Sequence, residues 1–233
     1  MRLVFGIGLS ILVVIAVALL FRLPTEFPVR DRGLPDLDLK QTKHLDIVAL
    51  GTSLTVRNNW PAQLATELED LLDYPVRLVR VAQSGMGSAW GLTALDRVDE
   101  ACPDLILIEF AVNDADIIDG VSLRKSMAQH DRLLAALADI LPDARILLMT
   151  TNPVTGLRGL KRPRLAAYYA AYEELARKHD AGLADFYPRW LEYIRQTDWS
   201  EDGLHPTDEA AIQIMLPVLH EIVGRSLKEG RAD

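Results

Sequence analysis

Two segments far apart in this chain contain the residue types that a nucleophilic catalyst needs. Ser53 lies in the run GTSLT at 51–55, and Asp202 and His205 lie together in the run DGLHP at 202–206. A serine hydroxyl becomes a nucleophile when a histidine removes its proton, and a nearby carboxylate fixes the tautomer of that imidazole. The same residues also suit plainer roles, because serine often caps a helix and Asp-Gly favours a turn. Their surroundings in the fold must decide between the two interpretations.

The elements that position these residues can be predicted from the hydrophobic pattern after residue 44. Strands are predicted at 45–50, 76–81, 104–110 and 145–150, with a weaker strand at 182–186, and helices at 60–73, 89–98, 121–141, 163–179 and 207–226. Such alternation predicts one three-layer α/β domain, with a doubly wound parallel sheet between two layers of helices. Ligands of such sheets bind beyond the carboxyl ends of the strands.

The candidate residues all follow predicted strands or precede the last helix. Ser53 follows the first strand, Gly85 the second and Asn113 the third, while Asp202 and His205 lie just before the last helix. We therefore expect them to converge at one edge of the sheet. There the N–H groups of Ser53 and Gly85 and the side-chain amide of Asn113 suit an oxyanion hole. Taken singly, Gly85 also fits a simple turn and Asn113 a cap, but the shared order favours a site.

At these positions the chain resembles the SGNH hydrolases, also called the GDSL esterase/lipase family. The matching blocks are Gly51-Thr52-Ser53-Leu54, Gln83-Ser84-Gly85-Met86-Gly87-Ser88, Ala111-Val112-Asn113-Asp114 and Asp202-Gly203-Leu204-His205-Pro206. Thr52 replaces the aspartate of the first block, and Ala111 replaces the first glycine of the third. The resemblance implies a flavodoxin-like fold, catalytic residues Ser53, Asp202 and His205, and hydrolysis of a carboxylic ester or thioester without a cofactor.

Two other functions remain open at this stage. An O-acyltransferase acting on envelope glycans would use the same triad, with a sugar hydroxyl in place of water. A catalytically silent binder of acylated glycan or lipid would keep the pocket, but the complete set of Ser53, Asp202 and His205 disfavours it. Neither the natural substrate, its acyl-chain length nor the oligomeric state can be predicted, because pocket-shaping loops vary most within a fold.

Composition narrows the choice of partners. The chain has 233 residues with 33 acidic and 25 basic side chains, and a net charge of -8, which disfavours nucleic acid as a partner. Cys102 is the one cysteine, so it forms no internal disulfide, and we expect a buried structural thiol. No metal site is predicted, because no cluster has ligand spacing. We expect His130 to lie on a solvated or helical face.

The N-terminus differs from the rest of the chain. Residues 3–21 carry no charge, which is about the length that crosses a bilayer as a helix. A cleaved signal peptide is the alternative, but no convincing cleavage site follows. We expect an uncleaved membrane anchor at 1–22, an extended tether at 23–43 that is broken by prolines and Gly33, and the hydrolase domain at 44–233.

The orientation of the anchor is less well determined by the charges. Arg22 and four further basic residues up to Lys43 outnumber Arg2, which by the positive-inside rule favours a cytoplasmic domain. A single N-terminal apolar segment more often delivers its domain outward, so we expect a periplasmic or extracellular domain. The basic loop 158–164 follows the fourth strand and is either solvated or steers an anionic substrate or lipid head group.

Overall fold

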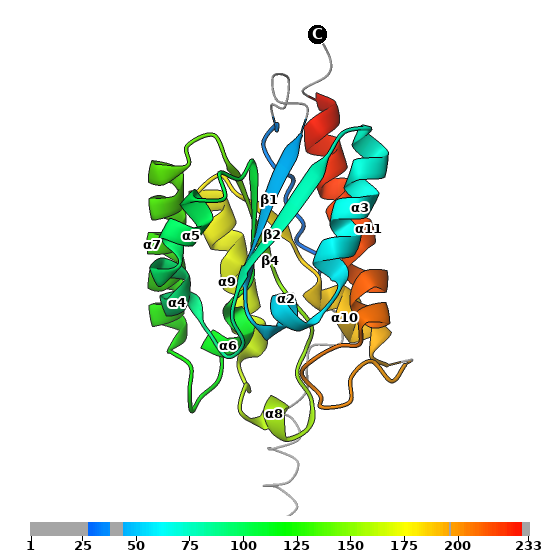
Figure 1. Cartoon of the computed structure of the whole chain (residues 1–233). Coiled ribbons are helices and arrows are strands. Elements are labelled where there is room, and N and C mark those ends of the chain that lie inside the picture. Colours follow the sequence, from blue (N-terminus) through cyan, green and yellow to red (C-terminus); the bar gives the residue numbers. More distant parts are fainter. Residues whose placement is uncertain (1–27, 38–43, 196, 230–233) are drawn as a thin grey trace, which may run out of the picture.

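The computed structural model describes residues 28–37, 44–195 and 197–229. Its sheet has the strand order β2-β1-β3-β4-β5, and every neighbouring pair is parallel (Figure 1). The strands are β1 (Leu45–Gly51), β2 (Val76–Ala82), β3 (Leu105–Ile108), β4 (Arg145–Met149) and β5 (Gly182–Ala184). This is the flavodoxin-like order of a doubly wound sheet, and it confirms the predicted α/β class.

Helices cover both faces of the sheet (Figure 1). One face carries α3 (Trp60–Leu72) and α11 (Asp208–Glu229), and the other carries α4 (Ser88–Thr93), α5 (Leu95–Asp99), α7 (Leu123–Ile140) and α9 (Leu165–Lys178). Three short helices, α2 (Ser53–Arg57), α6 (Ala111–Asp114) and α8 (Gly156–Leu160), follow the carboxyl ends of strands, and α10 (Tyr187–Tyr193) follows β5. The carboxyl edge of the sheet is the lower end of the molecule in Figure 1.

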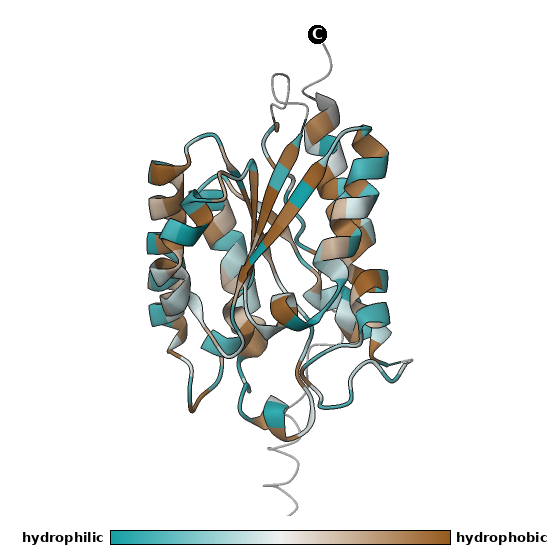
Figure 2. Cartoon of the chain, viewed as in Figure 1, coloured by the Kyte–Doolittle hydropathy of each residue, from teal (hydrophilic) through white to brown (hydrophobic). Residues whose placement is uncertain are grey.

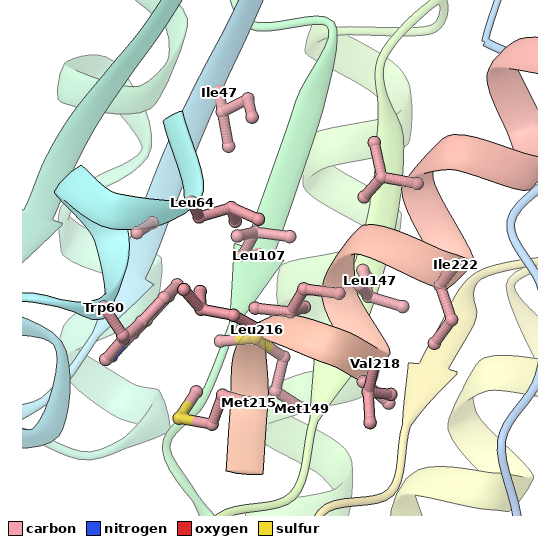
Figure 3. Close-up of a cluster of buried hydrophobic side chains, with 14 of the residues drawn as sticks. Ile47, Trp60, Leu64, Leu107, Leu147, Met149, Met215, Leu216, Val218 and Ile222 are labelled. Carbon is pink, nitrogen blue, oxygen red and sulfur yellow. The ribbon is translucent and has the colours of Figure 1, made fainter. Parts of the chain in front are cut away.

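Alternating strand residues build two separate cores. Ile47, Leu107 and Leu147 face α3 and α11, where they meet Trp60 and Leu216 (Figure 3). Their neighbours in sequence point to the opposite face, toward α7 and α9. Each fully buried aliphatic side chain stabilises the fold by roughly 1.5–3 kcal/mol relative to its exposed state. β3 and β4 are therefore apolar at consecutive positions, which is what made them recognisable in the sequence.

The boundaries differ from the predicted ones where local geometry interrupts the pattern. The helix predicted at 89–98 is divided at Ala94 into α4 and α5, and the strand predicted at 104–110 ends at Ile108. The helices α2, α6, α8 and α10 were not predicted. Each spans two turns or fewer, which is too short to show a helical period.

The predicted membrane anchor at 1–22 lies outside the described residues, as do 23–27 and 38–43 of the predicted tether. In the ranges that the structure covers, no helix combines the length and apolarity needed to span a membrane. Residues 28–37 pack on the domain: Arg32 forms an antiparallel bridge with Leu183, and Leu34 and Leu37 are buried. The division into anchor, tether and domain stays a prediction.

The prediction of a buried Cys102 was wrong, and of the two environments predicted for His130 the helix face is confirmed and the solvated one is wrong. Cys102 is exposed, because the chain adopts a left-handed conformation there (φ 45°) in the turn before β3. His130 lies on the inner face of α7 and is fully buried. Its polar partners come from other elements of the fold, which the sequence near His130 does not reveal.

Candidate active site

Ser53, His205 and Asp202 form a continuous hydrogen-bonded chain at the carboxyl edge of the sheet. The Ser53 hydroxyl oxygen lies 2.9 Å from His205 Nε2, and His205 Nδ1 lies 2.7 Å from Asp202 Oδ2. Because Asp202 accepts at Nδ1, the neutral imidazole carries its proton there and presents a lone pair to Ser53. The arrangement can therefore remove the serine proton.

The carboxylate of Asp202 is held by its own loop. Its Oδ1 accepts from the backbone N–H groups of Leu204 (2.9 Å) and His205 (2.8 Å). Partial burial raises the pKa of Asp202, but the hydrogen bonds from His205 and Leu204 outweigh that effect, so the pKa lies well below its ordinary value. Gly203 permits this tight loop, since its φ is 73° and a Cβ there would lie 2.8 Å from the Thr155 carbonyl oxygen.

Ser53 is the first residue of α2, directly after β1. Thr52 is the N-cap, and its hydroxyl accepts from the N–H of Leu54 at 3.2 Å. The first N–H groups of a helix have no intrahelical acceptor, so the N–H of Ser53 is free for another acceptor. Ser53 is 7% exposed, so this candidate nucleophile is largely buried and does not lie on an open surface.

Gly85 lies on the loop after β2 and Asn113 lies in the short helix α6, and a hydrogen bond joins these two segments. The Asn113 amide donates one of its hydrogens to the Met86 carbonyl at 2.8 Å, next to Gly85, and an amide has a second hydrogen to donate. Gly85 has φ 78° and open space where a Cβ would be, so its glycine is required by the backbone conformation. This hydrogen bond joins the two segments to each other, but it does not by itself join Gly85 or Asn113 to Ser53.

A small apolar cluster fixes three of the site loops relative to one another. It consists of Leu54, Val112 and Leu204, all buried, with Val154 packed against them. Each of the three directly adjoins a candidate site residue: Leu54 follows Ser53, Val112 precedes Asn113, and Leu204 precedes His205. Packing between these neighbours therefore sets the distances within the site.

Glu109 is a buried carboxyl group beneath the turn that carries Ser53, and the sequence interpretation missed it. It is 1% exposed and accepts from the Thr52 N–H (2.6 Å), the Thr52 hydroxyl (3.0 Å) and the Thr55 hydroxyl (2.8 Å). Burial raises the pKa of Glu109 to about 7 even though these hydrogen bonds lower it. A Cβ at position 51 would lie 2.3 Å from Glu109 Oε1, which explains Gly51.

A second buried polar network supports the Asn113 and Gly85 loops. Asp114 accepts from the N–H and hydroxyl of Ser88 (2.9 and 2.6 Å) and from the Ser126 hydroxyl (2.6 Å). His130 Nδ1 donates to the Ser126 carbonyl at 2.9 Å, so its Nε2 accepts from the Tyr172 hydroxyl, also at 2.9 Å. Burial lowers the pKa of His130 against the opposing charge of Asp114, which favours this neutral tautomer.

The signals for these missed residues were present but weak. Glu109 is a charged residue directly after four buried apolar residues of β3, and such an isolated charge near a motif indicates a buried partner. Ser126 and His130 lie four residues apart, and therefore on one face of a helix. Neither pattern identifies the partner, because Thr52, Asp114 and Tyr172 come from distant elements.

Two arginines flank the His205–Asp202 pair. Arg57 Nη1 lies 3.2 Å from His205 Nδ1 and 3.5 Å from Nε2, and Arg158 Nη2 lies 3.3 Å from Asp202 Oδ2. A pocket of about 410 Å³ opens beside His205 and is lined mainly by polar residues, including Arg57, Glu201 and Asp208. The site thus has room on the imidazole side for a polar group.

Comparison with known proteins agrees with this geometry. The model of the GDSL-like lipase/acylhydrolase family matches residues 47–211. An arylesterase from Vibrio mimicus is 26% identical over 183 residues, which cover 76% of this chain and 85% of that protein.

Solved structures share the fold. An acetylxylan esterase from Geobacillus stearothermophilus superposes with a TM-score of 0.66 at 16% identity, covering 83% of this chain and 97% of that one. An α/β hydrolase from the metagenome of Lake Arreo gives a TM-score of 0.66 at 18% identity, covering 78% and 95%. Because the family model spans most of the chain and the four blocks meet at one sheet edge, the chain belongs to the GDSL-like lipase/acylhydrolase family and is an ester-hydrolysing serine hydrolase.

Proposed function

We propose that this protein is a membrane-tethered serine esterase that cleaves carboxylic esters or thioesters through an acyl-enzyme on Ser53. The observation that carries the proposal is the hydrogen-bonded chain from Ser53 through His205 to Asp202, with distances of 2.9 and 2.7 Å. Such distances are those of a nucleophile with its general base already in place.

The reaction proceeds in two halves. Ser53 Oγ attacks the ester carbonyl while His205 Nε2 takes its proton, and the same proton then passes to the leaving alkoxide as the acyl-enzyme forms. Water attacks the acyl-enzyme in the second half and loses a proton to His205, which passes it to Ser53 Oγ as the acyl–oxygen bond breaks. The products are a carboxylic acid and an alcohol, or a thiol where the substrate is a thioester. Asp202 stays ionised throughout, in keeping with its lowered pKa, and stabilises the imidazolium.

The oxyanion of each tetrahedral intermediate accepts from three donors in this proposal. They are the backbone N–H groups of Ser53 and Gly85 and the second amide hydrogen of Asn113. The bond from Asn113 to Met86 supports this role, because it orients the amide beside the Gly85 loop. Donors fixed before the reaction stabilise developing charge without reorganisation.

For the location, we propose a membrane-anchored protein whose domain lies outside the cytoplasm. The proposal rests on the uncharged stretch at 3–21 and on the usual behaviour of a single N-terminal apolar segment. Alkaline extraction of membranes tests the anchor, and protease treatment of spheroplasts, which exposes periplasmic as well as extracellular domains, tests the side. Release into the supernatant, or full protection from external protease, would contradict the respective part.

Hydrolysis of p-nitrophenyl esters of graded chain length by the full chain in mild detergent tests the function. Ser53→Ala should lose turnover and fluorophosphonate labelling, whereas Ser122→Ala should keep both, since Ser122 only caps α7. If a serine other than Ser53 were the nucleophile, the Ser53→Ala variant would still be labelled by the fluorophosphonate. If the folded wild-type chain is neither active nor labelled, the proposal is wrong.

A further inference from the structure

Exposed aliphatic side chains gather on two loops at the active-site end of the domain. Ile117 and Ile118 are 68% and 67% exposed, and Leu157 and Leu160 are 83% and 63% exposed. The loops touch, because the Ile117 N–H donates to the Lys161 carbonyl at 2.8 Å. We call these four residues the apolar rim. Clustered exposed aliphatic residues on a soluble domain mark an interaction surface.

The apolar rim lies beside the active site and away from the opposite end of the domain. Two segments lie at the lower end of the molecule in Figure 1, namely helix α8 and the loop that precedes α7. Both contain brown, hydrophobic parts in Figure 2. The segment that leads into α8 also contacts the loop that carries Asp202 and His205, since the Thr155 N–H donates to the Gly203 carbonyl at 2.8 Å. Whatever covers the rim therefore lies at the entrance to the site.

The charge beside the apolar rim is locally basic. Segment 156–164 contains four basic residues and no acidic one, in a chain whose net charge is -8. Arg162 pairs with Asp116 and Arg158 with Asp202. The other two, Lys161 and Arg164, are exposed, and within the described ranges neither forms an ion pair. Asp119 on the facing loop is the exposed acidic neighbour. Apolar side chains interspersed with free cations suit an anionic lipid surface.

The path of the chain brings the same end of the domain toward a membrane. Residues 28–37 run antiparallel to β5, since Arg32 bridges Leu183, and the Arg30 N–H donates to Asp185, just beyond the carboxyl end of β5. The chain thus enters the domain at the active-site edge. The apolar segment ends at Phe21, and residues 22–27 span at most about 20 Å even when fully extended.

We propose that the apolar rim docks on the bilayer that holds the N-terminal segment, with Lys161 and Arg164 against anionic lipid head groups. Docking faces the active-site entrance toward the bilayer, so an ester presented at the lipid surface reaches Ser53 more readily than a dissolved one. The docking surface itself stands independently of the chemistry, whereas its effect on ester access rests on the proposed esterase function.

Depth-dependent quenching of a fluorophore in the full chain tests the docking. The label is placed at Leu157→Cys, and as control at Leu71→Cys, both in a Cys102→Ser background that removes the exposed native thiol. Leu71 is also exposed but lies at the end of α3, next to the amino end of β2. The protein is reconstituted in phosphatidylcholine vesicles with or without phosphatidylglycerol, doped with a lipid whose nitroxide lies near the head group.

The label at 157 should be quenched at least about threefold more strongly than the label at 71, and more strongly still with phosphatidylglycerol. Because the chain enters the domain at the active-site edge, tethering alone would also bring residue 157 nearer to the bilayer than residue 71. Docking therefore requires both quenching of the label at 157 by the nitroxide lipid and its protection from aqueous iodide, and a label that stays fully accessible to iodide would overturn the proposal. Equal quenching would overturn the proposal. So would protection of the label at 157 from both the nitroxide lipid and aqueous iodide, because a second copy of the chain would then cover the rim.

A double substitution tests the effect on ester access. Leu157→Asp with Leu160→Asp should lower hydrolysis of a vesicle-borne long-chain ester by about tenfold, because two apolar side chains no longer enter the interface. Turnover of dissolved p-nitrophenyl acetate should stay unchanged, and Leu71→Asp should affect neither substrate. Equal losses on both substrates, or no loss on the vesicle-borne one, would overturn the link. An inactive wild type would refute the esterase function alone, since quenching still reports docking.

Discussion

Replacing Glu109 by glutamine should remove a pH dependence of stability that this one side chain creates. Glu109 is fully buried beneath the turn that carries Ser53, and its acceptors are filled by donors from Thr52 and Thr55. Glutamine has nearly the same shape and keeps one carbonyl oxygen for the Thr52 N–H and the Thr55 hydroxyl. Its amide nitrogen can donate to the Thr52 hydroxyl oxygen, so the substitution mainly removes the ionisation.

The size of the effect follows from the pKa of Glu109. Burial raises it from an ordinary value of 4.5 to about 7. That difference corresponds to about 3 kcal/mol between the two protonation states. A raised pKa means that the folded protein binds the proton more tightly than the unfolded chain. The stability contributed by Glu109 is therefore complete below pH 4.5 and is lost as the pH rises toward about 7.

The measurement is urea unfolding of the full chain in mild detergent, followed by fluorescence of the buried residues Trp60 and Trp190. The free energy of unfolding of Glu109→Gln minus that of the wild type should rise by about 3 kcal/mol between pH 4.5 and 7 and then level off. The contributions of all other titrating groups cancel in this difference, because they are the same in the variant and the wild type. Glu69→Gln, at an exposed position, serves as the matched control. A flat difference for Glu109→Gln would show that hydrogen bonds, and not burial, determine its ionisation.

Three further predictions concern the loops of the site. Asn113→Ala should lower kcat by about 10² to 10³ with little change in KM, because an oxyanion donor acts in the transition state; an unchanged kcat would remove Asn113 from the oxyanion hole. Asp202→Asn should lower kcat by about 10⁴ through loss of the correct imidazole tautomer, with the melting temperature showing that the fold persists. Leu204→Ala should lower the free energy of unfolding by about 2 kcal/mol, read by urea denaturation, and also lower kcat, since it loosens the cluster behind His205; full activity would show that this packing does not set the geometry.

Much of the fold was predictable because its signals are local. β3 is apolar at every position and β4 at every position after Arg145, and a strand covered on both faces requires that pattern. The candidate residues could be placed at one edge because parallel strands all end there. This required only the order of the elements, and errors of a few residues in their boundaries did not affect it.

The supporting residues were not predictable, because their roles depend on contacts between distant segments. His130 meets Tyr172 across two helices, and Leu54, Val112 and Leu204 meet only when three loops fold together. A buried histidine and an exposed one have the same local sequence, so the pattern around His130 led to the wrong environment. The prediction for Cys102 was wrong because of the local backbone. The left-handed conformation at this residue, which the sequence does not reveal, turns the thiol outward.

Glu109 explains why this chain has Thr52 where the family motif has an aspartate. The N–H and hydroxyl of Thr52 both donate to this buried carboxyl group, and the hydroxyl oxygen also caps α2. An aspartate at position 52 could still cap the helix, but it would bring a second carboxylate to within about 3 Å of the first, and the two could ionise together only at great cost. Threonine offers the same cap with a proton to donate. The residue that makes the serine block look irregular is therefore the one that lets Glu109 remain beneath Ser53.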